Sequence, residues 1–138
     1  MSVASVISDL QTRHAAITGI TTASTTMPAS LNTASLPIVL VFPGEARHNP
    51  RRLSDTESYR TYLVRCYVAP VAQGQGIDES WQDVLILLDR FVTSYAQAHA
   101  VGATARIGQP YSDSGHIVAE FAGIAYHAFE FSLPIREL

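Results

Sequence analysis

The stretch IAYHAFEFSLPI, residues 124–135, decides the fold because it alternates apolar and polar side chains, as a half-buried strand does. The residues of odd number form its apolar face: Ala125, His127, Phe129, Phe131, Leu133 and Ile135. The residues of even number include Tyr126, Glu130 and Ser132. We therefore expect a strand with one face on the core and one imidazole, His127, on that face.

His127 is open to two interpretations, a packed strand residue or part of a reacting or metal-binding site. The five histidines are scattered singly along the chain and form no HxH or HExxH spacing: His14, His48, His99, His116 and His127. Metal sites usually contain such local pairs, so we expect no metal and no cofactor. The pattern favours a packed His127 with one ring nitrogen bonded to the backbone or to a neighbour.

Two amphipathic helices are predicted on either side of the first strands. In residues 80–100, one broad apolar stripe is formed by Trp81, Val84, Leu85, Leu88, Phe91, Val92 and Tyr95. Such a stripe predicts a helix lying across a sheet. Residues 3–17 repeat the helical spacing, with Ser2 available as the N-cap and Gly19 available to end the helix.

The segments between the helices are interpreted as strands and loops. Residues 37–44 form an apolar run between two prolines, and residues 59–71 alternate in polarity, so both are predicted strands. Residues 45–58 hold the densest charge in the chain and contain Pro50, which predicts an exposed loop. The Thr- and Ser-rich residues 18–37 are predicted to form a loop or a loose edge strand, and residues 72–80 a glycine-containing tip. Residues 104–111 are expected to form a short strand and a turn, and residues 112–116 a tight turn. The closing strands are expected to run through 117–135, with Gly123 at a bulge or bend.

The order of these elements predicts a single α+β domain spanning residues 1–138. Strands that follow one another through short connections favour antiparallel pairing. We expect a mostly antiparallel sheet of about four or five strands with the two helices packed on one face. The other face then needs cover, and association of subunits is one way to supply it.

Composition narrows the classes of function. Hydrophobic residues make up 47% of the 138 residues and charged residues only 15%, which indicates surface used for partners. The net charge of −3 disfavours direct nucleic-acid binding, and Cys66, the only cysteine, excludes an intrachain disulfide. The N-terminal residues do not resemble a secretory signal, and no stretch approaches the roughly 18 apolar residues of a membrane span. We expect a soluble protein made in a cytoplasm.

The segment SDSGH, residues 112–116, contains the residue types of a serine hydrolase within one turn. Neighbours in a turn do not align a nucleophile, a base and an orienting acid, and Asp, Ser and Gly are common turn residues. A small hydrolase that uses Ser114, His116 or His127 remains an alternative, and it requires at least two of them within hydrogen-bond reach in a pocket.

Three arginines in the charged segment, Arg47, Arg51 and Arg52, have two interpretations. They form either a solvated turn or a basic arm that contacts an acidic neighbouring protein.

In order of elements, nearly the whole chain resembles the tail terminator, or tail completion, proteins of long-tailed bacteriophages. The resemblance is carried by an N-terminal helix, the proline-flanked strand LPIVLVFPGEA, a charged segment, the strand YRTYLVRCYVAP, the helix WQDVLILLDRFV and a terminal pair of strands. It implies a non-enzymatic virion protein, assembled in the host cytoplasm, that forms a homo-oligomeric ring, by analogy a hexamer. Such a ring ends polymerisation of the tail tube and forms the joint with the head connector or head-closure protein.

Two further interpretations stay open. The chain resembles other neck components, a head-closure or a tail-tube protein, nearly as well. A ligand-binding α+β domain without a role in a virion is the remaining alternative. We also expect residues 20–36 and 45–58 to become ordered on docking, because their composition is rich in Ser and Thr or in charge.

Overall fold

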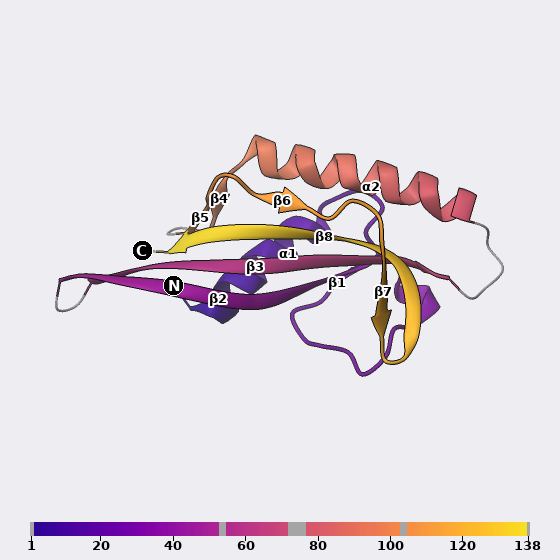
Figure 1. Cartoon of the computed structure of the whole chain (residues 1–138), viewed down its shortest axis with the longest axis horizontal. Coiled ribbons are helices and arrows are strands. Elements are labelled where there is room, and N and C mark those ends of the chain that lie inside the picture. Colours follow the sequence, from indigo (N-terminus) through magenta and orange to yellow (C-terminus); the bar gives the residue numbers. More distant parts are fainter. Residues whose placement is uncertain (1, 53–54, 72–76, 103–104, 138) are drawn as a thin grey trace.

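The computed structural model describes residues 2–52, 55–71, 77–102 and 105–137. An eight-stranded sheet forms its centre, in the order β1-β2-β3-β8-β5-β4, with β6 and β7 also paired to β8. The long strands β2, β3 and β8 run along the long axis of the molecule, and the end of β8 nearest β7 curls away from it (Figure 1). The strands are β1 Thr22–Ala23, β2 Ile38–Arg52, β3 Asp55–Pro70, β4 Ala100–Val101, β5 Ala105–Ile107, β6 Ser112–Asp113, β7 Ile117–Phe121 and β8 Ile124–Glu137.

The predicted sheet of four or five mostly antiparallel strands is wrong, because the sheet has eight strands and is mixed and curled. The α+β class itself holds. β1 pairs with β2 in parallel, and the other pairings are antiparallel. Strands β1, β4, β5 and β6 have only two or three residues each, too few to show an alternating pattern in the sequence. They form because neighbouring backbone places hydrogen-bonding groups beside a longer strand.

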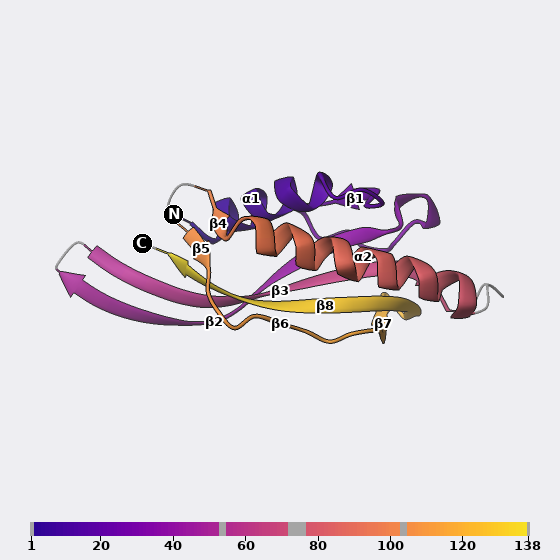
Figure 2. The same ribbon diagram turned by 90° about the horizontal axis from the view of Figure 1, so that it is seen from above.

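Both helices, α1 Val3–Ala15 and α2 Ile77–Gln97, cover the same face of the sheet (Figure 2). The main core lies between them and the odd-numbered face of β8, where Phe129, Phe131, Leu133 and Ile135 are fully buried. Phe91 of α2 packs against the rings of Phe129 and Phe131, with centroids 5.2 and 5.8 Å apart. The predicted apolar face is therefore confirmed over residues 129–135. Nearer β7, Tyr126 and Ala128 of the other face are buried as well, so the predicted half-buried alternation does not hold there.

Helix α1 begins as predicted, with Ser2 as its N-cap. The hydroxyl of Ser2 accepts a hydrogen bond from the amide of Ser5, and the Ser5 hydroxyl accepts one from the amide of Ser2, so two free amides at the helix start are satisfied. The helix ends at Ala15, and Gly19 follows with φ +100, a conformation that favours glycine.

A buried polar network joins α1, β2 and α2. The Gln11 amide donates to the carbonyl oxygens of Ser24 and Val39, which leaves its Oε1 to accept from Nδ1 of His14 at 2.9 Å. Nε2 of His14 then accepts from the hydroxyl of Tyr95 at 2.7 Å. These hydrogen bonds place the proton of the neutral His14 imidazole on Nδ1, and they satisfy both ring nitrogens inside the core.

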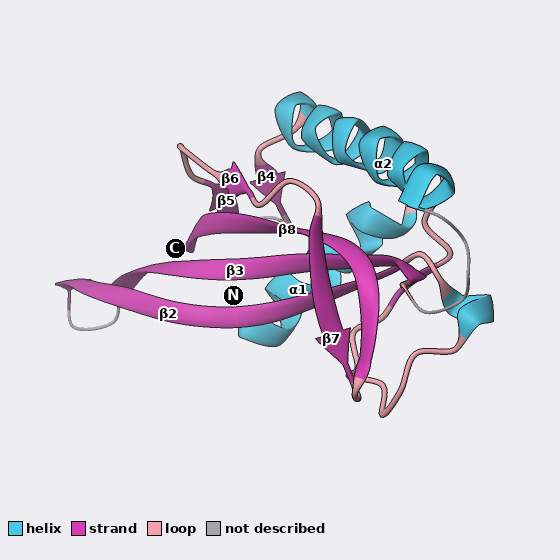
Figure 3. Cartoon of the chain, turned by 45° about the vertical axis from the view of Figure 1, so that its right-hand side comes forward, coloured by secondary structure: helices cyan, strands magenta, loops and turns pink. Residues whose placement is uncertain are grey.

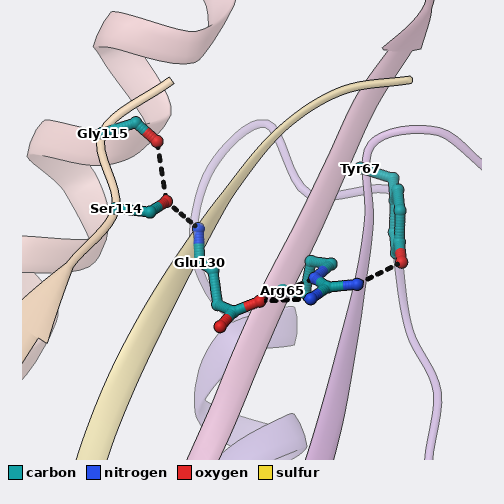
Figure 4. A network of polar contacts seen from close by, with 5 residues as sticks. All are labelled: Arg65, Tyr67, Ser114, Gly115 and Glu130. Atoms are coloured by element: carbon teal, nitrogen blue, oxygen red, sulfur yellow. Dashed lines mark hydrogen bonds and ion pairs between the residues drawn. The ribbon is translucent and has the colours of Figure 1, made fainter. Parts of the chain in front are cut away.

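The opposite face of the sheet does not depend wholly on a partner for cover. At one end, Tyr67, Tyr126 and Ala128 form a second buried cluster with Ile38, Leu40 and Ala119, against which residues Leu31 and Leu36 pack. In the middle, Arg65 of β3 forms an ion pair with Glu130 of β8, and its guanidinium also donates to the hydroxyl of Tyr67 (Figure 4). These groups cover part of this face within one chain, and cover of the remainder by other subunits stays a prediction.

The prediction of an exposed loop over residues 45–58 is also wrong. These residues form the far part of the β2–β3 hairpin, with residues 53 and 54 outside the described part, and they project beyond the body of the molecule (Figure 3). The charged side chains of Glu45 and Arg47 are exposed on this ribbon, and Pro50 is tolerated because β2 is an edge strand there. We call residues 45–52 and 55–59 the arm.

Candidate interaction surface

Helix α2 splits its apolar residues between the core and solvent. Val84, Leu87, Phe91 and Tyr95 are buried, at helical spacing. Trp81, Leu85 and Val92 follow a parallel line along the helix and are 41%, 39% and 40% exposed, with half-buried Leu88 between them. We call these four residues the α2 stripe. The predicted single stripe lying across the sheet is therefore wrong in part, because the sheet covers only one side of it.

An apolar line on a solvent-facing helix is typical of a surface that docks on a protein. Tryptophan is among the residues that contribute most to protein interfaces, because a large ring is removed from water at low conformational cost. A further exposed apolar residue of α2, Ile86, faces a different side of the helix, near Gly19 and Pro37. The α2 stripe is therefore a defined line and not a general exposure of the helix.

The first turns of α2 meet two histidines, and we call Trp81, His116 and His127 the histidine cluster. Nε2 of His116 lies 3.0 Å from Nδ1 of His127, and the His116 ring contacts the Trp81 ring edge-on at 5.6 Å between centroids. His127 is 5% exposed, and its pKa is lowered by burial and further by the neighbouring His116. The prediction of a packed His127 with a ring nitrogen bonded to a neighbour is confirmed.

The β7–β8 hairpin brings these histidines together. Val118 pairs with His127 across the hairpin, and a turn at Ala122 and Gly123 closes it, so His116, two residues before Val118, shares the face of His127. Gly123 has φ +81, which the tight turn requires. The sequence predicted the bulge or bend at Gly123 but not the register that pairs Val118 with His127, and this register is what brings His116 to His127.

Of the three residues that the hydrolase alternative names, the structure brings His116 and His127 together but not Ser114. Ser114 donates its hydroxyl proton to the carbonyl oxygen of Gly115 at 2.8 Å and accepts from the amide of Glu130 at 3.0 Å (Figure 4). Among the described residues, no hydrogen bond joins the Ser114 hydroxyl to either imidazole, whereas nucleophile activation requires a base that takes this proton. Ser114 instead attaches the segment after β6 to β8.

The structure describes only one of the three side chains that the sequence proposed as a basic arm. Arg47 lies exposed on the arm, whereas the side chains of Arg51 and Arg52 lie outside the described part of the structure. At the base of the arm, Glu57 is 3% exposed and forms an ion pair with Arg136 of β8. His48 and Ser58 are joined across the hairpin by a hydrogen bond of 2.7 Å. The arm is thus held to the body at its base by polar contacts.

Other candidate sites offer little chemistry. Cys66 is fully buried, and burial raises the pKa of its thiol, which makes it a poor nucleophile. Among the described residues, no group of three or more His, Cys, Asp or Glu side chains is placed to hold a metal ion. A hollow of about 460 Å³ between the ends of α1 and α2 is lined by Arg13 and Arg90, whose guanidinium groups donate to the carbonyl oxygens of nearby loops.

Comparisons with known proteins leave the family open. A scan against protein-family models and a search of curated proteins both give no match. No described helix is long and apolar enough to cross a membrane. The function of this chain is therefore inferred from the surfaces described above, the α2 stripe, the histidine cluster and the arm.

Proposed function

We propose that this chain is a structural protein of a long-tailed bacteriophage, a tail terminator that forms a ring on the end of the tail tube. The ring would stop tube polymerisation and form the joint with the head connector or head-closure protein. The proposal joins the resemblance in element order to the distribution of binding surfaces on the subunit. It assigns the chain no catalytic role.

One observation carries the proposal: the two candidate contact surfaces lie at different ends of the molecule. The arm projects at one end of the long axis, and the N-terminal end of α2, where Trp81 lies, is at the other (Figure 1). A subunit with two different contact surfaces associates head to tail, and head-to-tail contacts close into rings when the rotation between subunits permits. A subunit built for a twofold dimer would instead use one self-complementary surface.

The arm supports an assembly role for a second reason. The pairing of β3 with β8 stops at Ser58 opposite Glu137, so the arm beyond this point is a ribbon of two strands. An isolated two-stranded ribbon is marginally stable in water. Packing against a neighbouring subunit or the tail tube would stabilise it.

The arm is built to bind through side chains and not by adding a strand. Pro43 and Pro50 lie on the edge strand β2, and register shifts occur between Pro43 and Ala46 and between Pro50 and Arg52. Prolines and bulges are features that prevent pairing of exposed strand edges. Arg47, Arg51 and Arg52 are therefore proposed to contact an acidic surface of the tube or connector.

The decisive experiment measures the assembly and its position. The purified chain is sized by light scattering and imaged by electron microscopy, alone and with purified tail tubes. We expect rings of a single size, by analogy hexamers, bound at one end of each tube. Binding along the tubes or incorporation into them would favour a tail-tube component, binding to connectors alone would favour a head-closure protein, and a monomer that binds neither would refute the proposal.

A further inference from the structure

The histidine cluster has a property that an ordinary packed pair of side chains lacks. Two ring nitrogens 3.0 Å apart, with ring centroids 5.2 Å apart, point almost directly at each other and hold a single proton between them. In the neutral pair, one ring donates this N–H and the other accepts it. Whether the hydrogen bond between the two rings is kept or lost therefore depends on the number of protons that the pair binds.

The two protonation steps of such a pair have opposite effects. A first added proton binds the outer nitrogen of the donor ring and turns the contact into a stronger, charge-assisted hydrogen bond. A second proton must bind the accepting nitrogen, which sets two N–H groups and two positive charges against each other. Burial of His127 makes this second step more costly. The pair stays closed through the first step and opens at the second.

Among the described residues, no carboxylate forms an ion pair with either imidazole of the cluster, so this repulsion is not neutralised by a direct contact. On β8, Glu130 points to the opposite face and pairs with Arg65, and on β3 the residue opposite His127 is Ala69. At the end of β6, the Asp113 carboxylate accepts a hydrogen bond from the amide of Gly115. Asp83 of α2 and Glu120 of β7 are exposed, and the side chains of Asp78 and Glu79 lie outside the described part.

Opening of the pair would be local. Ser114 keeps its own contacts to β8, since its amide donates to the carbonyl oxygen of Glu130 and its hydroxyl accepts from the amide of Glu130. These bonds do not titrate in the range of an imidazole. The groups free to move are the ring of His116 and, in contact with it, the ring of Trp81, which begins the α2 stripe.

We propose that His116 and His127 form a proton-operated latch that positions Trp81 and thereby makes docking on the α2 stripe dependent on pH. The first proton strengthens the latch, because an imidazolium is attracted to the indole ring that His116 contacts. The second proton releases it. The latch follows from the geometry of the cluster, and its effect on docking rests on the proposed function.

The latch is tested with Trp81, the only tryptophan of the chain, as its reporter. Fluorescence is followed from pH 8 to pH 4.5, with EDTA present because imidazoles bind transition metals, and far-ultraviolet circular dichroism marks the range in which the chain stays folded. We expect two fluorescence steps with midpoints at least about one pH unit apart, as for coupled groups. The His127→Gln variant should show one step, and His48→Gln, which changes an exposed histidine of the arm, should keep both.

A second measurement protects the test against variants that do not fold. Nitrogen NMR of the histidine rings in the unaltered chain follows each imidazole directly, and we expect His116 and His127 to titrate in two coupled steps. Independent single titrations of both rings, or an identical fluorescence profile in the chain and in His127→Gln, would overturn the latch.

The effect on docking is measured by light scattering at pH 8, 6.5 and 5. We expect the assembled fraction to fall at the pH of the second fluorescence step, and the fall to be absent or shifted in His127→Gln. Rings that respond identically in both chains would overturn the link between latch and docking. Absence of rings at every pH would refute the proposed function and the docking effect together, while the fluorescence titration would still decide the latch.

Discussion

The hydroxyl of Tyr95 donates a hydrogen bond to Nε2 of His14 across 2.7 Å, at a place where neither side chain reaches solvent. The His14 ring also stacks on Phe91, with centroids 5.3 Å apart. Because Gln11 accepts from Nδ1 of the same ring, the imidazole has no nitrogen left for a second proton without losing a bond. The contact between α1 and α2 therefore depends on a neutral histidine.

This dependence predicts loss of stability in acid. Burial, with a smaller effect of Arg13, lowers the pKa of His14 from 6.5 to about 3, so the unfolded chain binds a proton more readily than the folded chain between these values. The contribution is complete above pH 6.5 and is lost as the pH falls toward 3. The free energy of unfolding should decrease with a slope that approaches about 1.4 kcal/mol per pH unit, measured by urea denaturation.

A matched pair of variants isolates this contribution from other groups, including His127. His14→Asn should be less stable than the unaltered chain at pH 7.5 but lose less stability between pH 6.5 and 5. His48→Gln, which removes an exposed histidine, should keep the original pH dependence. An unchanged slope in His14→Asn would show that His14 is not the group responsible.

Tyr95→Phe tests the same network without changing a charge. The substitution keeps the ring and removes the hydroxyl, which leaves Nε2 of His14 buried without a donor. An unsatisfied buried acceptor costs about 1–3 kcal/mol, so the urea midpoint should fall accordingly. Tyr111→Phe, in a half-buried ring that contacts Tyr95 edge-on, should have a much smaller effect, and equal losses in the two variants would contradict the network.

Gly44→Ala tests the bend at the base of the arm. A Cβ at position 44 would lie 2.6 Å from the backbone oxygen of Thr61, closer than any real contact, so β2 and β3 would have to separate. We expect a loss of about 1–3 kcal/mol in unfolding free energy, as for other overpacked sites. Glu45→Ala, at the exposed neighbouring position, should have little effect, and a Gly44→Ala chain as stable as this control would contradict the close approach.

The α2 stripe makes a prediction about assembly without loss of fold. The triple variant Trp81→Gln, Leu85→Gln and Val92→Thr changes exposed groups, so its thermal unfolding should stay close to that of the unaltered chain. Ring formation, measured by light scattering, should fall at least about tenfold because the apolar contact is removed. Ile86→Thr alters an exposed apolar residue outside the stripe and should assemble normally, whereas equal effects would place the contact elsewhere.

The arginines of the arm predict an electrostatic contact. Replacing Arg47, Arg51 and Arg52 with alanine should weaken attachment of rings to tail tubes and reduce its dependence on salt, because attraction between charges is screened by ions. Electron microscopy at two ionic strengths measures both effects. Arg106→Ala removes an exposed arginine of β5, which is not part of the arm, and serves as the control. Unchanged attachment and salt dependence in the triple variant would remove the arginines from the interface.

Much of the local structure could be predicted from the residues alone. The alternation of residues 124–135 identified the core-facing side of β8, and Ser2 and the spacing of Val6 and Leu10 identified α1. Such patterns can be recognised in the sequence because buried positions recur every two residues in a strand and every 3.6 residues in a helix. The same rule explains the failure over residues 45–58, because the neighbouring side chains of Arg47, His48 and Asn49 are all exposed and show no alternation of burial.

By itself, the sequence determined the two helices, the parts of the long strands that lie in the body, and the position of the core along β8, because buried residues recur with the period of the helix or strand that carries them. Only the tertiary structure decided the eight-stranded pairing, the exposed half of the α2 apolar residues, and the meeting of His116, His127 and Trp81 from three segments. These depend on contacts between residues far apart in the chain or across a turn. Such contacts leave no periodic pattern of apolar residues in the sequence.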